Sequence, residues 1–286
     1  MNDSPPVVLV PGFWHGGWCW GPVAEQLTAR GIRSVAVDID GHALRGRAMR
    51  ARWARPFFDE RSFATEPSPV ARITASGAAA ALADRVRKEG GGRPCLVVAH
   101  GMGGVVATAL AELAPELVAG LVYVSAYAPV NGMPAGSYRT CPENVAEKAL
   151  QLLAADPKLI GAARIDFGDP ERRDEIKEAF YNDLDDRAAD AAMALLSPDG
   201  PAGIAGERLT VAEARFGRVP HSYVTCSRDN VVPPALQRRF IKEIDAVSVF
   251  PTAVTELDSS HAPFLSRPVA LGEAIADAAG VHAEAA

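Results

Sequence analysis

The chain has 286 residues, of which 48% are hydrophobic, and its formal net charge at pH 7 is −6. This length and apolar content suffice for one sizeable core, and the acidic balance excludes a partner bound through basic charge, such as nucleic acid. The chain opens without a basic stretch or an apolar signal core, and no apolar run reaches membrane-spanning length, so we expect a cytoplasmic protein without membrane contact. The four cysteines lack metal-ligand spacing, and we expect neither a metal nor a cofactor.

Apolar runs that alternate with helical patterns predict a parallel sheet flanked by helices, an α/β protein. In the first part of the chain the expected elements are a strand at residues 7–10, a helix at 23–30, a strand at 34–38, a loop rich in arginine and aromatic residues at 41–74, and a helix at 75–88. The Gly-rich loop after the first strand is suited to supply a backbone N–H to a bound oxyanion. Phe13 is the first candidate donor and Trp14 the next, and Trp14 is also expected in the wall of a substrate pocket.

The run Leu96-Val97-Val98-Ala99-His100-Gly101-Met102-Gly103-Gly104 predicts a buried strand that ends in a tight turn and is followed by a helix. This is the setting of the G-x-S-x-G motif, in which a nucleophilic serine stands on a strained turn above a parallel sheet. Gly101 occupies the position of that serine, and because glycine has no side-chain atom that attacks a carbonyl, no acyl-enzyme can form there. The N–H of Met102 is the second expected oxyanion donor. His100 is expected to pack beneath the turn or to border the substrate pocket.

A strand at residues 121–125 follows, after which the pattern turns helical and polar between residues 126 and 219. The candidate helices in this stretch are residues 144–154, 172–180 and 186–196. An insertion between the strands of a sheet is typical of a lid that closes over a site and shapes its pocket.

Candidates for the other members of a catalytic triad follow in the chain order acid and then base. Asp229 lies after a β-branched strand at residues 223–226, at the edge where α/β sheets place their chemistry. His261 follows a strand at residues 247–257, and histidine is the usual general base because its ordinary pKa lies near neutral pH. Asp258 is a rival partner for His261, but we prefer Asp229, because a residue three positions away rarely reaches the far nitrogen of the ring.

The sequence resembles the α/β-hydrolase superfamily, and within it the small esterases similar to plant methylesterases and hydroxynitrile lyases. The residues that carry the resemblance are Pro11-Gly12-Phe13-Trp14-His15-Gly16-Gly17-Trp18-Cys19-Trp20, Ala99-His100-Gly101-Met102-Gly103-Gly104, Phe180-Tyr181-Asn182-Asp183, Arg228-Asp229-Asn230 and Ser260-His261-Ala262-Pro263-Phe264. The resemblance implies an α/β-hydrolase fold with a core of residues 1–125 and 220–286 and a helical cap of residues 126–219. It also implies that Tyr181 borders the substrate pocket. The sequence departs from the family at Pro11, where histidine is usual, and at Gly101, where serine is usual.

Three functions are compatible with these residues. The first is an ester hydrolase for a hydrophobic small molecule, whose elbow serine has been replaced by design or by natural loss. The second is a serine-independent lyase, cyclase or isomerase in which His261, held by Asp229, abstracts a proton, or in a further version activates a water molecule in the space that the hydroxyl vacated. The third is a non-catalytic binding protein. A buried acid–base pair costs stability unless it is used or paired, which argues against the binding protein. The ester-hydrolase interpretation leads and the lyase interpretation follows closely, for a monomer or a homodimer.

Overall fold

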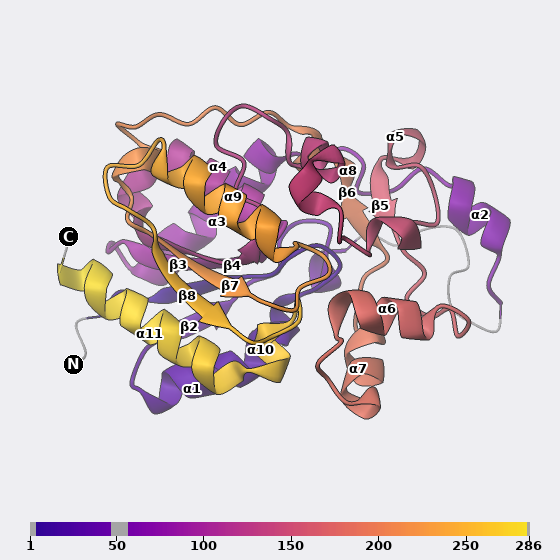
Figure 1. Ribbon diagram of the computed structural model, residues 1–286. Coiled ribbons are helices and arrows are strands. Elements are labelled where there is room, and N and C mark those ends of the chain that lie inside the picture. Colours follow the sequence, from indigo (N-terminus) through magenta and orange to yellow (C-terminus); the bar gives the residue numbers. More distant parts are fainter. Residues whose placement is uncertain (1–3, 47–56, 285–286) are drawn as a thin grey trace.

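Six strands form one parallel sheet in the computed structural model, which describes residues 4–46 and 57–284 (Figure 1). The strand order is β2-β1-β3-β4-β7-β8, and every neighbouring pair is parallel. The bounds are Val7–Val10 for β1, Ser34–Ala36 for β2, Cys95–Gly101 for β3, Val118–Ala126 for β4, His221–Cys226 for β7 and Ala253–Leu257 for β8. The expected α/β class and parallel sheet are therefore confirmed. Residues 47–56 of the arginine-rich loop lie outside the described residues.

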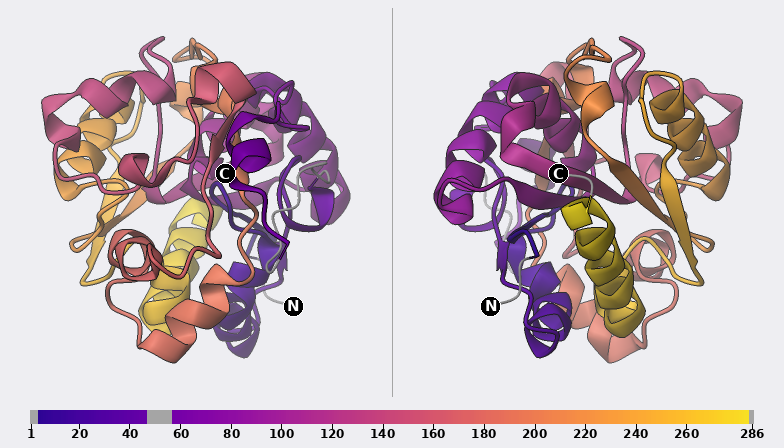
Figure 2. Two further views of the ribbon diagram at one scale, coloured as in Figure 1. Left: turned by 90° about the vertical axis from the view of Figure 1, so that its right-hand side faces the viewer. Right: turned by 90° about the vertical axis from the view of Figure 1, so that its left-hand side faces the viewer.

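Helices cover both faces of the sheet, and Figure 2 shows the two layers from the ends of the molecule. The helices α1 and α11 pack together on one face, whereas α3, α4 and α9 lie on the other (Figure 1). Their bounds are Gly21–Ala29 for α1, Ala75–Gly90 for α3, Gly103–Leu113 for α4, Pro234–Asp245 for α9 and Pro268–Glu284 for α11, with the short helix α10 at Pro263–Ser266. Among the described residues, no helix combines the length and the apolar character that crossing a membrane requires.

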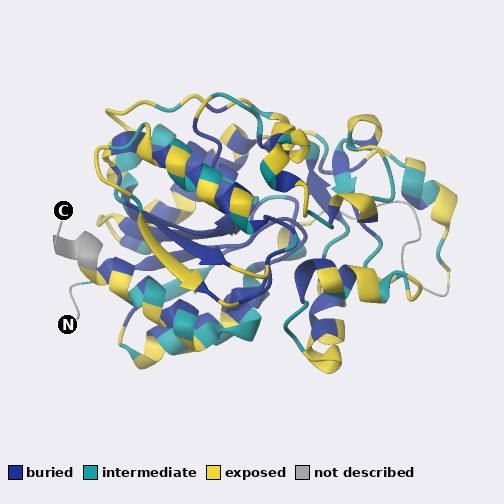
Figure 3. Ribbon diagram, in the orientation of Figure 1, coloured by how far each residue is buried: buried dark blue, intermediate teal, exposed yellow. Residues whose placement is uncertain are grey.

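The core lies in the central strands, where apolar side chains point to both helix layers. All residues of β1 and β3 are buried, as Figure 3 shows, because a parallel strand covered on two faces needs a continuous apolar run. The edge strand β8 is exposed except at Leu257. Helix α3 begins where the hydroxyl of Thr74 accepts a hydrogen bond from the N–H of Gly77, and it ends at Gly91 in the left-handed conformation. These local signals explain why the core elements follow the sequence pattern.

The order of the strands brings four loops together at one edge of the sheet. Strands β3, β4, β7 and β8 are successive neighbours, so their carboxyl ends lie side by side. Gly101 ends β3, Ser125 lies near the end of β4, and Asp229 and His261 follow β7 and β8. The strand arrows in Figure 1 point toward the residues that connect β4 to β7.

We call these connecting residues, 127–220, the inserted segment. Its helices are α5 at Pro157–Ile160, α6 at Arg173–Phe180, α7 at Asp186–Met193 and α8 at Ala202–Gly206, and its strands β5 at Ala162–Arg164 and β6 at Asp199–Pro201 pair antiparallel. Helix α2, at Glu60–Thr65, lies at the same end of the molecule (Figure 1). The two expected helices at 172–180 and 186–196 are present, although the second ends earlier. The two short strands were not expected, since runs of three residues carry too little periodicity to detect.

The prediction of a helix at residues 144–154 is wrong. Short 3-10 turns at Pro142–Asn144 and Leu150–Leu152 are found there instead. A continuous helix would use its own carbonyls to accept from each backbone N–H. Here the N–H of Lys148 donates to the carbonyl of Asn230 at 2.7 Å instead. The N–H groups of Ala149 and Leu150 donate to the carboxyl of Glu147. Contacts with a distant loop and with a local side chain therefore replace the helical bonds.

Candidate active site

The turn after β3 has the backbone of a nucleophile elbow. Gly101 has φ +50°, in the left-handed region that a side chain adopts only with strain. Gly103, two residues on, lies so close to the first-strand loop that a Cβ there would be 2.3 Å from the carbonyl oxygen of Pro11. At Gly101 itself there is room, since a Cβ would lie 3.4 Å from Nε2 of His261 and 3.5 Å from Cα of Gly12. The elbow therefore keeps its shape and lacks only the functional group.

His261 and Asp229 form a buried acid–base pair beside the elbow. Nδ1 of His261 donates to Oδ2 of Asp229 at 2.9 Å, and the two residues are 4% and 2% exposed. Oδ1 of Asp229 accepts from the N–H groups of Val231 at 2.7 Å and Val232 at 2.9 Å, which fixes the carboxylate. With Nδ1 holding the proton, Nε2 of His261 is the basic nitrogen, and it faces the position of the absent serine. The rival Asp258 instead pairs with Arg228 at 2.7 Å on the surface.

Ser125 is a third polar member of this group, and the sequence reasoning missed it. Its hydroxyl donates to Oδ2 of Asp229 and lies 3.4 Å from Nδ1 of His261. The residue is fully buried and has φ +44°, a strained conformation outside glycine. The sequence did contain a signal, since Ser125 is a polar residue near the end of the largely apolar strand β4. In the sheet, β4 lies between β3, which ends at the elbow, and β7, which precedes Asp229. This signal becomes readable only once the strand order is known.

Two further histidines lie behind the pair and are held neutral. Nε2 of His100 donates to the carbonyl of His261 at 2.8 Å, and burial lowers the pKa of His100 well below its ordinary value. Nδ1 of His15 donates to the carbonyl of Phe13 at 3.0 Å, and its Nε2 accepts from the hydroxyl of Tyr181 at 2.8 Å. Burial lowers the pKa of His15 to about 3. His100 is fully buried, as expected for packing beneath the turn rather than for the substrate pocket. Tyr181 is also fully buried in this layer, which differs from the expectation that it borders the pocket.

The run of residues 180–183 connects the inserted segment to the loops that carry Asp229 and His261. The side-chain N–H of Asn182 donates to the carbonyl of Arg228 at 3.0 Å. Oδ2 of Asp183 accepts from the N–H of Ser260, next to His261, at 3.1 Å. These contacts, together with the bond from Tyr181 to His15, show what the polar residues of this run do: they hold the loops of the acid and the base in place.

A cavity of about 550 Å³ opens above the elbow and has two unlike sides. The core side consists of the expected residues Phe13, Trp14, Gly101, Met102 and His261. The inserted segment supplies an opposite wall that is mostly apolar, including Tyr127, Leu150, Leu153, Ala163 and Ala205. Trp14 joins the two sides, because its indole N–H donates to the carbonyl of Ala163 at 2.9 Å. A pocket of this volume and character suits a hydrophobic small molecule.

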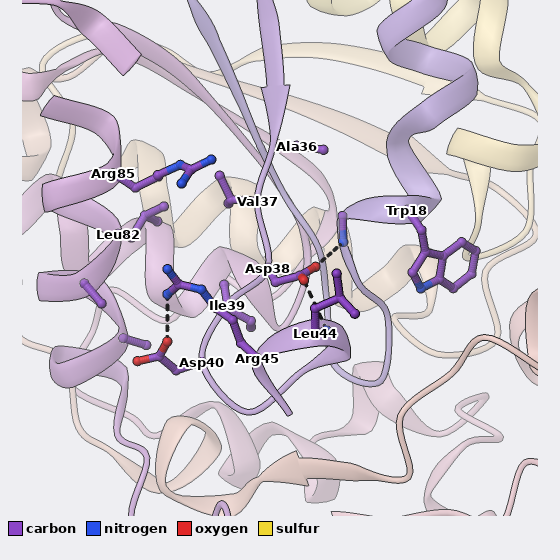
Figure 4. Close-up of a pocket in the computed structure, with 13 residues that line it drawn as sticks. Trp18, Ala36, Val37, Asp38, Ile39, Asp40, Leu44, Arg45, Leu82 and Arg85 are labelled. Carbon is purple, nitrogen blue, oxygen red and sulfur yellow. Dashed lines mark hydrogen bonds and ion pairs between the residues drawn. The ribbon is translucent and has the colours of Figure 1, made fainter. Parts of the chain in front are cut away.

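A second cavity, of about 500 Å³, lies beside β2, and Figure 4 shows its charged residues. Asp38 accepts from the N–H groups of Gly17 at 2.7 Å and Leu44 at 3.3 Å, and Asp40 pairs with Arg45 at 2.9 Å. These carboxylates order the loop that follows the strand. The described residues that line this cavity include none of the sequence-predicted site residues, whereas five of those residues border the cavity above the elbow.

A comparison with family models decides the identity of this architecture. The model of the alpha/beta hydrolase family matches residues 7–274. This chain belongs to the alpha/beta hydrolase family. The hydrolase fold accounts for the sheet, for the elbow at Gly101 and for the chain order of Asp229 and His261.

Relatives place the chain among the ester hydrolases of that family. A pyrethroid hydrolase from Sphingobium wenxiniae is 29% identical over 282 residues, which cover 97% of this chain and 89% of that protein. Methylesterase 7 of Arabidopsis thaliana is 26% identical over 279 residues, which cover 93% of each chain. A crystal structure of a pyrethroid hydrolase from Sphingobium faniae has a TM-score of 0.73 at 25% identity, and the match covers 98% of this chain and 99% of that chain. The resemblance to the methylesterase branch is thus confirmed, and the chain is an enzyme-family member of the ester-hydrolase kind.

Proposed function

We propose that this alpha/beta hydrolase acts on a hydrophobic carboxylic ester without a covalent intermediate, using His261 and Asp229 to activate water in place of a serine. The observation that supports the proposal is the position of His261: its Nε2 lies 3.4 Å from where a Cβ of residue 101 would stand. A water molecule in that space would meet the same base that a serine hydroxyl meets in a relative with a complete triad. The mostly apolar cavity above the elbow supports a hydrophobic substrate.

The steps follow from the geometry of the pair. His261 removes a proton from water through Nε2, and the resulting hydroxide attacks the ester carbonyl. The carbonyl oxygen becomes an oxyanion beside the backbone N–H groups of Met102 and of Phe13 or Trp14, all of which border the cavity. Asp229 stabilises the imidazolium through the bond at 2.9 Å. When the tetrahedral intermediate collapses, the imidazolium returns its proton to the leaving alkoxide, so that ester and water give acid and alcohol.

The same geometry supports a second candidate, proton abstraction from a carbon acid, as in a lyase, cyclase or isomerase. No side chain at position 101 stands between Nε2 of His261 and the cavity, so a substrate carbon can approach the base directly. The oxyanion donors would then hold an enolate. Exchange of solvent deuterium into a bound carbonyl compound, without cleavage, would favour this candidate over hydrolysis.

The experiment compares the wild-type chain with Gly101→Ser, Gly101→Ala and His261→Ala on a panel of aryl and methyl esters. We expect slow hydrolysis without a burst in the wild type, and a loss of about 100-fold or more in His261→Ala, as general-base catalysis implies. Gly101→Ser should be faster than the wild type and should be labelled by a serine-directed phosphonate. Gly101→Ala is the matched control, because it adds the same Cβ and backbone strain without a hydroxyl, and it should not be labelled.

The outcomes separate the hypotheses. If the wild type and a folded Gly101→Ser variant are both inert on every ester, the ester-hydrolase proposal is wrong. If the wild type and His261→Ala hydrolyse esters equally slowly, His261 is not a base in this chain. Tight binding of ligands without turnover or deuterium exchange in any variant would indicate the binding protein instead.

A further inference from the structure

A carboxyl group that the proposed mechanism does not use borders the cavity. Glu147 lies in the inserted segment, in a wall that is otherwise largely apolar, and it is partly buried. Burial raises its pKa to about 7, and the nearby charge of Asp229 acts in the same direction. An acidic group that is half-ionised at neutral pH and faces a ligand cavity is unusual for a purely structural residue.

Glu147 borders the cavity beside the loop that carries Asp229. The backbone N–H of the following residue, Lys148, donates to the carbonyl of Asn230, which adjoins Asp229. Tyr127 also borders the cavity there, and its backbone N–H donates to the carbonyl of Gly101 at 2.9 Å. Burial raises the pKa of Tyr127, and the charges of Glu147 and Asp229 add to that effect. Glu147 is therefore close to the position where a bound ester would react.

A local structural role accounts for only part of the carboxyl group. Oε1 of Glu147 accepts from the N–H groups of Ala149 at 2.6 Å and Leu150 at 2.9 Å, which caps the turn at Leu150–Leu152. Oε2 has a single longer contact with the N–H of Leu150, at 3.1 Å. A carboxylate has about four acceptor sites, so Oε2 retains capacity for a ligand.

We propose that Glu147 is a specificity-determining residue whose free acceptor capacity binds a hydroxyl or N–H group of the ligand. The preferred substrate is then a hydrophobic ester that also carries a hydrogen-bond donor near the ester group. This assignment of substrate class rests on the proposed function. A buried polar site of this kind discriminates against an analogue without the donor, because the acceptor would remain unpaired.

The test measures binding rather than turnover, with 2-naphthol and 2-methoxynaphthalene as matched probes, the second of which carries a methyl group in place of the hydroxyl hydrogen. We expect the wild type to bind 2-naphthol about tenfold more tightly, as a hydrogen bond to a charged acceptor implies. In Glu147→Gln the amide oxygen can still accept the hydrogen bonds of Ala149 and Leu150. The amide N–H₂ group, which donates, then stands in place of the free carboxylate oxygen, so the preference for 2-naphthol should disappear or reverse. Glu143→Gln is the matched control: Glu143 belongs to the same segment but pairs with Arg239 at 3.1 Å.

The pH dependence adds a readout that a capping role would not change. As pH rises from 6 to 8 the carboxylate form of Glu147 increases, and the preference for 2-naphthol should increase in the wild type and in Glu143→Gln but not in Glu147→Gln. Of the described residues, the other charged or titratable groups at this cavity are Tyr127, Arg139, Lys158 and His261, with Asp229 behind His261. All of these are common to the three proteins, so a difference between them isolates Glu147.

Two results would overturn the proposal: an equal preference in the wild type and Glu147→Gln, or no binding of 2-naphthol to the wild type at millimolar concentration. Failure of the proposed function gives a different pattern. Inert wild-type and Gly101→Ser proteins would contradict ester hydrolysis and would leave the preference of the wild type for 2-naphthol unchanged.

Discussion

The two sides of the cavity differ in how their polar groups are held. On the core side, the carboxylate of Asp229 accepts from two backbone N–H groups, from His261 and from Ser125, so its orientation is fully determined. On the inserted side the wall is mostly apolar, and the buried cation Arg164, which is not among the residues that line the cavity, pairs with Asp199. The core side therefore holds a fixed set of hydrogen-bonding groups around Asp229, whereas the inserted side supplies most of the apolar wall of the cavity. Substitutions on the two sides should therefore change different quantities.

The largest expected effect concerns the stability of the inserted side. Arg164 is fully buried and donates to Asp199 through Nε at 2.6 Å and Nη2 at 2.8 Å, and its Nη1 donates to the carbonyl of Phe63 at 2.6 Å. In Arg164→Met the carboxylate of Asp199 stays buried without its cation, so the free energy of unfolding should fall by about 3–5 kcal/mol. Urea denaturation measures this. Adding Asp199→Leu should recover most of the loss, and a single-variant loss below about 1 kcal/mol would contradict the assignment.

A smaller effect is expected on the core side, and it should appear in the rate. The test uses the Gly101→Ser enzyme as its background. Adding Ser125→Ala removes the hydrogen bond from the Ser125 hydroxyl to Asp229, so kcat should fall about 10- to 100-fold while KM stays unchanged. Ser125→Gly is the matched control. It should lose the same rate but be about 1 kcal/mol more stable than Ser125→Ala, because glycine tolerates φ +44°. A change in KM alone would mean that Ser125 only shapes the cavity.

The smallest effect concerns His15, which links the two sides through Tyr181. Its pKa is about 3 in the folded protein and 6.5 ordinarily, so below pH 6.5 the unfolded chain binds a proton that the folded chain does not. The stability contributed by this group is therefore present above pH 6.5 and is lost as pH falls toward 3. Between pH 7 and 5.5 the loss should be about 1 kcal/mol. Urea denaturation of His15→Gln should show a correspondingly smaller pH dependence, and an unchanged slope would contradict the low pKa.

Much of the core side could be predicted because its signals are local. The apolar runs of β1 and β3, the glycines around Gly101 and the order of Asp229 and His261 lie within short windows of sequence. Ser125 was not found, because its role depends on which strands are neighbours. The choice between Asp229 and Asp258 could be argued from the sequence, but the bond of 2.9 Å to His261 is visible only in three dimensions.

The inserted side was less predictable because contacts between residues far apart in the sequence determine its structure. The expected helix at 144–154 is replaced by turns whose N–H groups bond to Asn230 and to the side chain of Glu147. Tyr181 was expected at the pocket, but its hydroxyl bonds to His15 in the layer behind. Local propensity is a weak guide where few residues form a regular element, because a contact with a distant loop then outweighs it.

By itself the sequence determined the fold class and the glycine at the elbow, and it singled out Asp229 and His261 as candidates for the acid and the base. Each of these depends on the period of apolar residues or on residue types that have few chemical alternatives. The tertiary structure alone decided which side chains of the inserted segment border the cavity, which histidines are neutral and where Glu147 faces. Those properties arise from burial and from contacts between residues far apart in the chain, which no short window of sequence contains.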